Sequence, residues 1–168
     1  DFLFSRAFQL MAKYGDIGTL KILSDTSVVI AEGEVLEISN DRDPTINEDL
    51  YFKVINAKTA SLFSAACQVG GISAKATNKE IESLKSFGTN FGMAFQLIDD
   101  AIDYASDKNS LGKNIGDDFK EGKITLPVIL AYIRSNKKEK EFWNSTIIEL
   151  DQKENDFYKA FLIMTKYK

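Results

Sequence analysis

Three aspartates, Asp99, Asp100 and Asp103, are the residues of this sequence whose type and spacing best suit chemistry. They lie in the segment FQLIDDAIDY (residues 95–104), which otherwise has the composition of a helix interior. On a helix, at about 100° per residue, the three carboxylates fall within about 100° of one another. Adjacent like charges destabilise a helix by roughly 0.2–0.5 kcal/mol per pair, and a bound divalent cation would remove that repulsion. The same stripe of the helix also holds Lys85, Thr89, Gly92, Gln96 and Asp107.

Magnesium is the cation that such a cluster predicts, because Mg²⁺ prefers oxygen ligands and completes its octahedron with water and substrate phosphates. The implied substrate is a phosphate or diphosphate. Lys113, Lys120 and Lys123, in the segment that follows, could neutralise the remaining phosphate oxygens. The alternative is a solvated helix face, but such a face normally intersperses lysines, and none stands between Gln96 and Asp107.

The composition excludes several other kinds of chemistry. The sequence has no histidine, which rules out Ser-His-Asp triads and zinc held by histidine. A formal charge of -4 and a pI near 5.0 argue against nucleic-acid binding. The single cysteine, Cys67, lies among small residues and is expected to be a buried free thiol in a reducing cytoplasm. No stretch approaches the roughly 20 apolar residues of a membrane span.

The elements that must position these residues are expected to be long helices. Only two prolines and ten glycines interrupt 168 residues, and few runs alternate apolar with polar, so an all-α fold in one domain is predicted. T-x-x-E capping boxes at Thr45–Glu48 and Thr77–Glu80 are expected to open two of the helices. The predicted helices cover about residues 2–14, 18–39, 47–70 and 78–105, and helices resume near Pro127, Lys138 and Glu154 after a loop at 106–125.

Two expectations concern the helix of residues 78–105 and the ends of the chain. We expect the helix to bury its apolar side, with Gly92 leaving room beside the carboxylates. The apolar side consists of Phe91, Ala94, Phe95, Ile98, Ile102 and Ala105. Because the chain starts at Asp1 and both ends are helical in pattern without caps, we expect it to be a piece of a longer protein.

The sequence resembles the trans-polyprenyl diphosphate synthases, in particular the long-chain group that includes the octaprenyl enzymes. The resemblance rests on the order and spacing of DFLFSRAF, EGEVLE, KTASLF, GMAFQLIDDAIDY and LGKNIGDDFKEGKITLPVILA. It implies the helical bundle of isoprenoid synthases, in which Asp99, Asp100 and Asp103 form the second aspartate-rich motif and bind Mg²⁺. It also implies that Lys58, Thr59 and Gln96 line the allylic cation, and that Lys58, Lys113 and Lys123 contact diphosphate.

This resemblance begins downstream of the family's first aspartate-rich motif, so the chain is expected to be the C-terminal part of a synthase domain. The family commonly has glutamine at the position of Glu37, whereas Glu32 and Glu34 match and are expected to be packing or supporting positions. In the family, the residues that form the floor of the product tunnel lie mainly just before this missing motif, which leaves the product chain length open.

The resemblance implies a cytoplasmic prenyltransferase that adds isopentenyl diphosphate to an allylic diphosphate. Its product would be a long-chain polyprenyl diphosphate of the kind used for quinone side chains. A homodimer is expected, because VVIAEGEVLEI and NAKTASLFSAACQVGG are richer in small and apolar residues than one bundle face requires. Two alternatives stay open: a non-catalytic subunit of a heteromeric synthase, and a terpene cyclase of the same fold.

Overall fold

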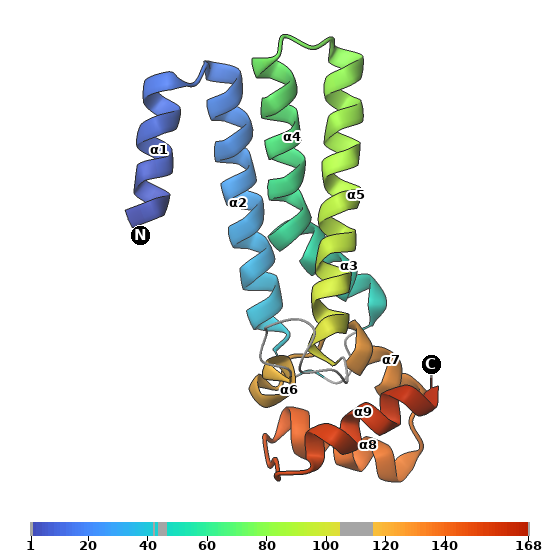
Figure 1. Cartoon of the computed structure of the whole chain (residues 1–168). Helices are drawn as coiled ribbons and strands as arrows, with labels where there is room; N and C mark the ends of the chain where they lie inside the picture. The colour runs from blue at the N-terminus through green and yellow to red at the C-terminus, as the bar shows by residue number, and fades with distance from the viewer. Residues whose placement is uncertain (1, 42, 44–46, 105–115, 168) are drawn as a thin grey trace. The chain divides into compact units, whose positions relative to one another are not determined.

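A computed structural model describes residues 2–41, 43, 47–104 and 116–167. All regular structure in these residues is helical, which confirms the all-α prediction. The chain divides into two compact units, residues 1–35 with 54–94 and residues 36–53 with 95–168, which are described separately (Figure 1). No helix among the described residues is long and apolar enough to cross a membrane.

Most helix boundaries agree with the predicted ranges, but the single helix predicted over 47–70 consists of three successive elements and ends at Ser73. The helices and two π-helical turns are α1 Phe2–Tyr14, α2 Ile17–Ser39, α3 Glu48–Ile55, η1 Asn56–Ala60, α4 Ser61–Ser73, α5 Asn78–Asp103, α6 Asp117–Glu121, α7 Leu126–Arg134, α8 Lys137–Trp143, η2 Asn144–Ile148 and α9 Asp156–Tyr167.

Local side-chain caps explain where several of these helices begin. The Thr77 backbone N–H donates to Glu80 at 2.7 Å, and the Glu80 N–H donates to the Thr77 hydroxyl at 3.4 Å, so the predicted capping box opens α5. Thr45 lies outside the described residues, and Asn47 caps α3 by accepting from the Leu50 N–H at 3.0 Å. Proline in the first turn of α7 agrees with the predicted start near Pro127.

In the first unit, α4 and the first part of α5 run antiparallel through a face of small residues (Figure 1). A Cβ on Gly88 would lie 2.6 Å from the Phe63 carbonyl oxygen, and one on Gly92 would lie 2.6 Å from the Ala60 Cα. The Ser64 hydroxyl also donates to the Lys85 carbonyl at 3.1 Å. The two backbones approach this closely only because α5 has glycine at both positions.

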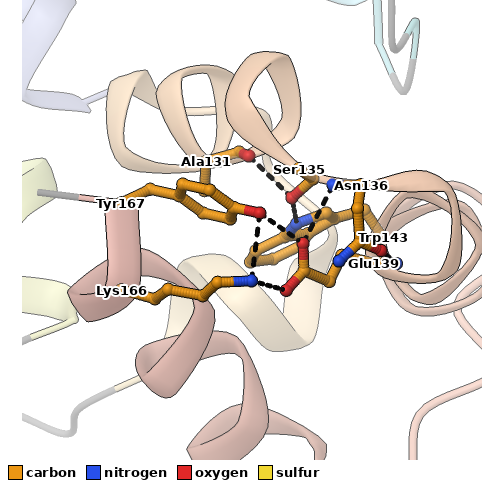
Figure 2. Close-up of polar contacts among 7 residues, drawn as sticks. All are labelled: Ala131, Ser135, Asn136, Glu139, Trp143, Lys166 and Tyr167. Atoms are coloured by element: carbon orange, nitrogen blue, oxygen red, sulfur yellow. Dashed lines mark hydrogen bonds and ion pairs between the residues drawn. The ribbon is translucent and has the colours of Figure 1, made fainter.

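The second unit has a core that its C-terminal helices share, with α7 packed against α9. The core residues are Tyr104, Phe119, Val128, Ala131, Phe142, Trp143, Ile147, Ala160 and Ile163. The Trp143 Nε1–H donates to the Ser135 hydroxyl at 3.1 Å, and that hydroxyl donates to the Ala131 carbonyl at 2.7 Å (Figure 2). The indole N–H of Trp143 and the hydroxyl of Ser135 therefore both have partners inside this core.

A second polar network in this unit joins α8 to α9. Asn136 and Glu139 form a capping box at the start of α8. Glu139 also accepts from Lys166 and from the Tyr167 hydroxyl, both at 2.7 Å (Figure 2). One carboxylate thus caps its own helix and binds two side chains near the end of α9.

Three sequence predictions about the elements were wrong. The expected loop at 106–125 contains α6, a short helix whose Gly116 and Gly122 caps adopt left-handed backbone. The predicted buried side of α5 is instead exposed at Phe91, Phe95 and Ile98. Gly92 leaves no free room, because Ala60 and Phe63 occupy that space.

Candidate functional site

Asp100 is the most enclosed of the three predicted aspartates, with 4% of its surface exposed. Its Oδ2 accepts from the Tyr51 hydroxyl at 2.6 Å, and its Oδ1 accepts from the Gln96 side-chain amide at 2.7 Å. Gln96 lies one turn earlier on α5, whereas Tyr51 comes from α3. Both carboxylate oxygens are therefore held, one by the same helix and one by another.

Asp103 is the last residue of α5 and is joined to the segment around α6. Its Oδ2 accepts from the Asp118 backbone N–H at 3.0 Å. The Asp118 carboxylate in turn pairs with Lys123 at 3.2 Å, and Lys123 also pairs with Glu121 at 2.8 Å. Lys123, which was predicted to contact diphosphate, is thus paired with two carboxylates. One of them belongs to Asp118, whose backbone binds the predicted metal ligand Asp103.

Burial decides the electrostatics of this region. Desolvation raises the pKa of Asp100 against the opposing effect of the Tyr51 and Gln96 hydrogen bonds, and the Asp99 charge raises it further. Desolvation likewise raises the pKa of Asp118, opposed by Lys123. The pKa of Tyr51 is raised strongly by burial and by Asp100, which keeps the phenol protonated as the donor. Gathering several carboxylates here is unfavourable unless a cation binds.

The donor set around Asp100 suits a hard divalent cation that brings its own water and phosphate ligands. Among the described residues no group of three or more acidic or cysteine side chains is preassembled to hold a metal ion. Mg²⁺ does not require such a set, since one or two carboxylates with water and substrate oxygens suffice. Asp99 and Asp103 are half-buried and thus less enclosed than Asp100.

Lys58 and Thr59 lie in the first unit, on the π-helical turn η1. The turn is defined by the Ser61 N–H, which donates to the Asn56 carbonyl five residues back. Such turns inside α-helices occur frequently at functional sites. Lys58 is exposed and Thr59 is half-buried.

Gly33, in the EGE of α2, packs directly on this turn. A Cβ there would lie 2.7 Å from the Ala57 Cβ and 3.0 Å from the Lys58 backbone nitrogen. Glu32 and Glu34 on either side are exposed, so packing in this segment belongs to the glycine and not to the two glutamates. The exposure of Glu32 and Glu34 contradicts a packing role, and a supporting role for them stays a prediction.

The remaining predicted residues are placed as follows. The second unit contains Gln96, Asp100, Asp103 and Lys123. The first unit contains Lys58 and Thr59. Lys113 and Asp107 lie outside the described residues.

Sequence reasoning missed Tyr51, Asp118 and Gly33. Tyr51 and Asp100 are 49 residues apart, and no periodicity joins residues across such a separation. Asp118 lies in α6, within the segment predicted to be a loop, where no periodicity indicates which side chains approach the site. Gly33 could have been found, because a glycine inside a long helix usually marks a close approach of another backbone.

Comparison with known proteins places these features in a family. The family model for polyprenyl synthetase matches residues 1–164. Octaprenyl diphosphate synthase of Escherichia coli (strain K12) is 50% identical over 131 residues, which cover 78% of this chain and 41% of that protein. The corresponding Haemophilus influenzae enzyme is 40% identical over 168 residues, covering 100% of this chain and 51% of the relative.

A solved structure is similar over almost the whole chain. The polyprenyl synthase of Caulobacter crescentus CB15, complexed with calcium and isoprenyl diphosphate, is 46% identical with a TM-score of 0.93. The similarity covers 99% of this chain and 51% of that one. The chain spans about half the length of the relatives it matches. Because the match extends over nearly all of its residues, this chain belongs to the polyprenyl synthetase family.

Proposed function

We propose that this chain is part of a trans-prenyltransferase that joins isopentenyl diphosphate to an allylic diphosphate and makes a long-chain polyprenyl diphosphate. The observation that carries the proposal is the buried Asp100 carboxylate, held by Tyr51 and Gln96 between Asp99 and Asp103 on one helix. The names of its relatives, octaprenyl diphosphate synthase and a polyprenyl synthase complexed with isoprenyl diphosphate, support the substrate class.

In this proposal Asp99, Asp100 and Asp103 offer oxygen ligands to a divalent cation, and the donors Tyr51 and Gln96 hold Asp100 in place. The Caulobacter structure complexed with calcium supports a divalent cation, and we assign Mg²⁺ because it binds well to few carboxylates together with phosphate oxygens. When bound, Mg²⁺ supplies positive charge that stabilises the departing diphosphate. Lys123 adds charge from the chain itself, and we assign Lys58 and Lys113 the same role.

The proposed reaction begins when the allylic carbon–oxygen bond breaks and its electron pair leaves with diphosphate. The double bond of isopentenyl diphosphate then supplies the electron pair for the new carbon–carbon bond, and the proton that is lost goes to the diphosphate. The side-chain oxygens of Thr59 and Gln96 are assigned to face the allylic cation, which fixed dipoles stabilise without reorganisation. No covalent nucleophile is needed.

The proposal extends to the assembly and its surroundings. We infer that the chain is the C-terminal part of a synthase domain, and that the protein works as a homodimer in the cytoplasm. Exposed apolar residues on α2, including Val28 and Val35, support an interface. The free cysteine Cys67 fits a reducing compartment.

Kinetics of the full-length protein with both diphosphates and Mg²⁺ test the activity. Asp99→Ala is expected to lower turnover by about 10²-fold or more, by analogy with loss of one preorganised electrostatic contact. Asp25→Ala, which removes an exposed carboxylate paired with Lys21, is the control and should leave turnover unchanged. Near wild-type turnover of Asp99→Ala at limiting Mg²⁺ would reject the metal site and favour the alternative, a solvated helix face without a bound cation.

A further inference from the structure

Tyr51 has no role in the chemistry described so far, yet its hydroxyl makes one of the shortest polar contacts in the second unit. Its oxygen lies 2.6 Å from Asp100 Oδ2, and Tyr51 and Asp100 are only 5% and 4% exposed. Charge-assisted hydrogen bonds of this length are stronger than neutral ones. The contact therefore binds α3 to α5 at the carboxylate itself.

The two donors on Asp100 together determine the orientation of its carboxylate. Gln96 holds Oδ1 at 2.7 Å from within α5, and Tyr51 holds Oδ2 from α3. With a donor on each oxygen, the carboxylate cannot rotate without breaking a bond, and its remaining lone pairs point in set directions. Outer partners of this kind orient ligands of metal sites and are important for metal affinity.

Tyr104 is a second buried tyrosine in this unit with which Tyr51 can be compared. Tyr104 is also 5% exposed and belongs to the same unit, but its hydroxyl lies near the Thr125 side chain without a well-formed hydrogen bond to any described residue. The two tyrosines thus match in burial and differ in what the hydroxyl does. They form a natural pair for comparison.

We propose that Tyr51 is a positioning residue that acts with Gln96 through Asp100, and that this orientation of the carboxylate sets the affinity for the divalent cation. The inference rests on the proposed function. Tyr51 touches neither substrate nor cation in this scheme. Its effect passes through the direction in which Asp100 presents its lone pairs to a cation bound beside Asp99 and Asp103.

Binding of Mn²⁺ to the full-length protein, with inorganic pyrophosphate present, tests this by the electron paramagnetic resonance signal of free Mn²⁺. Tyr51→Phe is expected to weaken Mn²⁺ binding about tenfold, the usual effect of losing such an outer partner. Tyr104→Phe is the matched control and should bind Mn²⁺ as the wild type does. Equal Mn²⁺ affinity in Tyr51→Phe and the wild type would overturn the inference.

A double-mutant cycle with Gln96→Leu separates positioning from a general loss of stability. If both donors act through one carboxylate, Tyr51→Phe with Gln96→Leu weakens Mn²⁺ binding by less than the product of the two single effects. Independent, multiplying effects would overturn the inference. If Tyr51→Phe does not fold, Gln96→Leu alone decides, because unchanged Mn²⁺ affinity there also contradicts the locking of Asp100.

The wild type and Asp103→Asn distinguish this inference from the proposed function. Absence of saturable Mn²⁺ binding in the wild type, or full binding in Asp103→Asn, would reject the metal site and the inference with it. Saturable binding that Asp103→Asn abolishes and Tyr51→Phe leaves intact would reject only the role of Tyr51.

Discussion

Asp100 and Glu139 are carboxylates in the same unit whose surroundings shift their pKa values in opposite directions. Desolvation raises the pKa of Asp100, although two hydrogen bonds oppose it. Glu139 is half-buried, and hydrogen bonds from Lys166, Tyr167 and the Asn136 backbone lower its pKa from about 4.5 to about 2 (Figure 2). Glu139 is already paired with the cationic side chain of Lys166, whereas a cation beside Asp100 belongs to the proposed function.

The lowered pKa of Glu139 predicts how acid affects stability. A carboxylate with a depressed pKa in the folded protein stabilises it above the unfolded pKa, near 4.5, and loses that contribution as the pH falls toward 2. Glu139→Gln keeps an acceptor for the cap and removes the charge. Urea unfolding should therefore show a deficit of the variant at pH 6 that shrinks between pH 4.5 and pH 2.

Glu141→Gln, on the same helix, serves as the control for this measurement. A deficit of Glu139→Gln that stayed constant across this pH window would mean that the pair with Lys166 contributes nothing to stability, as many exposed ion pairs do not.

At the scale of elements, the contact of α4 with α5 predicts opposite effects for two glycine substitutions. A Cβ at Gly92 would lie 2.6 Å from the Ala60 Cα, so Gly92→Ala forces the helices apart and should destabilise the first unit by roughly 1–3 kcal/mol. Nothing lies within 4 Å of a Cβ at Gly70, so Gly70→Ala should stabilise the protein by about 0.5–1 kcal/mol. Chemical denaturation of both variants measures the difference, and equal effects would show that the helices do not meet through glycine.

These helices also show how far the sequence could predict the fold. Periodicity and caps located α1, α2, α5 and α7 to within a residue or two, because both signals are local. The buried side of α5 was assigned wrongly because aromatic residues were given more weight than glycines. Gly88 and Gly92 let α4 approach one side of α5, whereas Phe91 and Phe95 on the other side stay exposed.

The candidate site was predictable only in part, for the same reason. Asp99, Asp100 and Asp103 are recognisable by spacing along one helix. The partner of Asp100 is not, since the bond to Tyr51 joins two helices that only tertiary packing brings together. The short helix α6 was missed because its five residues between two glycines are too few to show a period.

At the scale of the whole molecule, apolar surface predicts self-association. Val28 and Val35 on α2 and Leu62 on α4 are more than half exposed in this chain, and we propose that a second copy of the protein covers them. Sedimentation velocity of the full-length protein at micromolar concentration should therefore give a dimer. A monomer, or a complex only with a second kind of chain, would contradict the homodimer.

Two matched substitutions locate that interface. Val28→Glu should shift the protein toward the monomer without changing its helix content, because Val28 is 56% exposed within the subunit. Ile133→Glu alters a residue of α7 that is also 56% exposed, and it should leave the sedimentation unchanged. Dissociation by both variants would point to a general effect of added charge.

The π-helical turn at Asn56–Ala60 bears on how a gene of this kind can change in length. Such a turn contains one residue more than the α-helix that would replace it, so losing one codon here would leave α4 facing as before. A one-codon deletion within α4 would instead rotate the residues before the deletion by about 100° relative to those after it. Such a rotation would carry Ser64 and Ala65 out of their buried positions. The stretch most tolerant of an in-frame deletion thus coincides with Lys58 and Thr59, the two residues of this turn to which we assign roles in the proposed reaction.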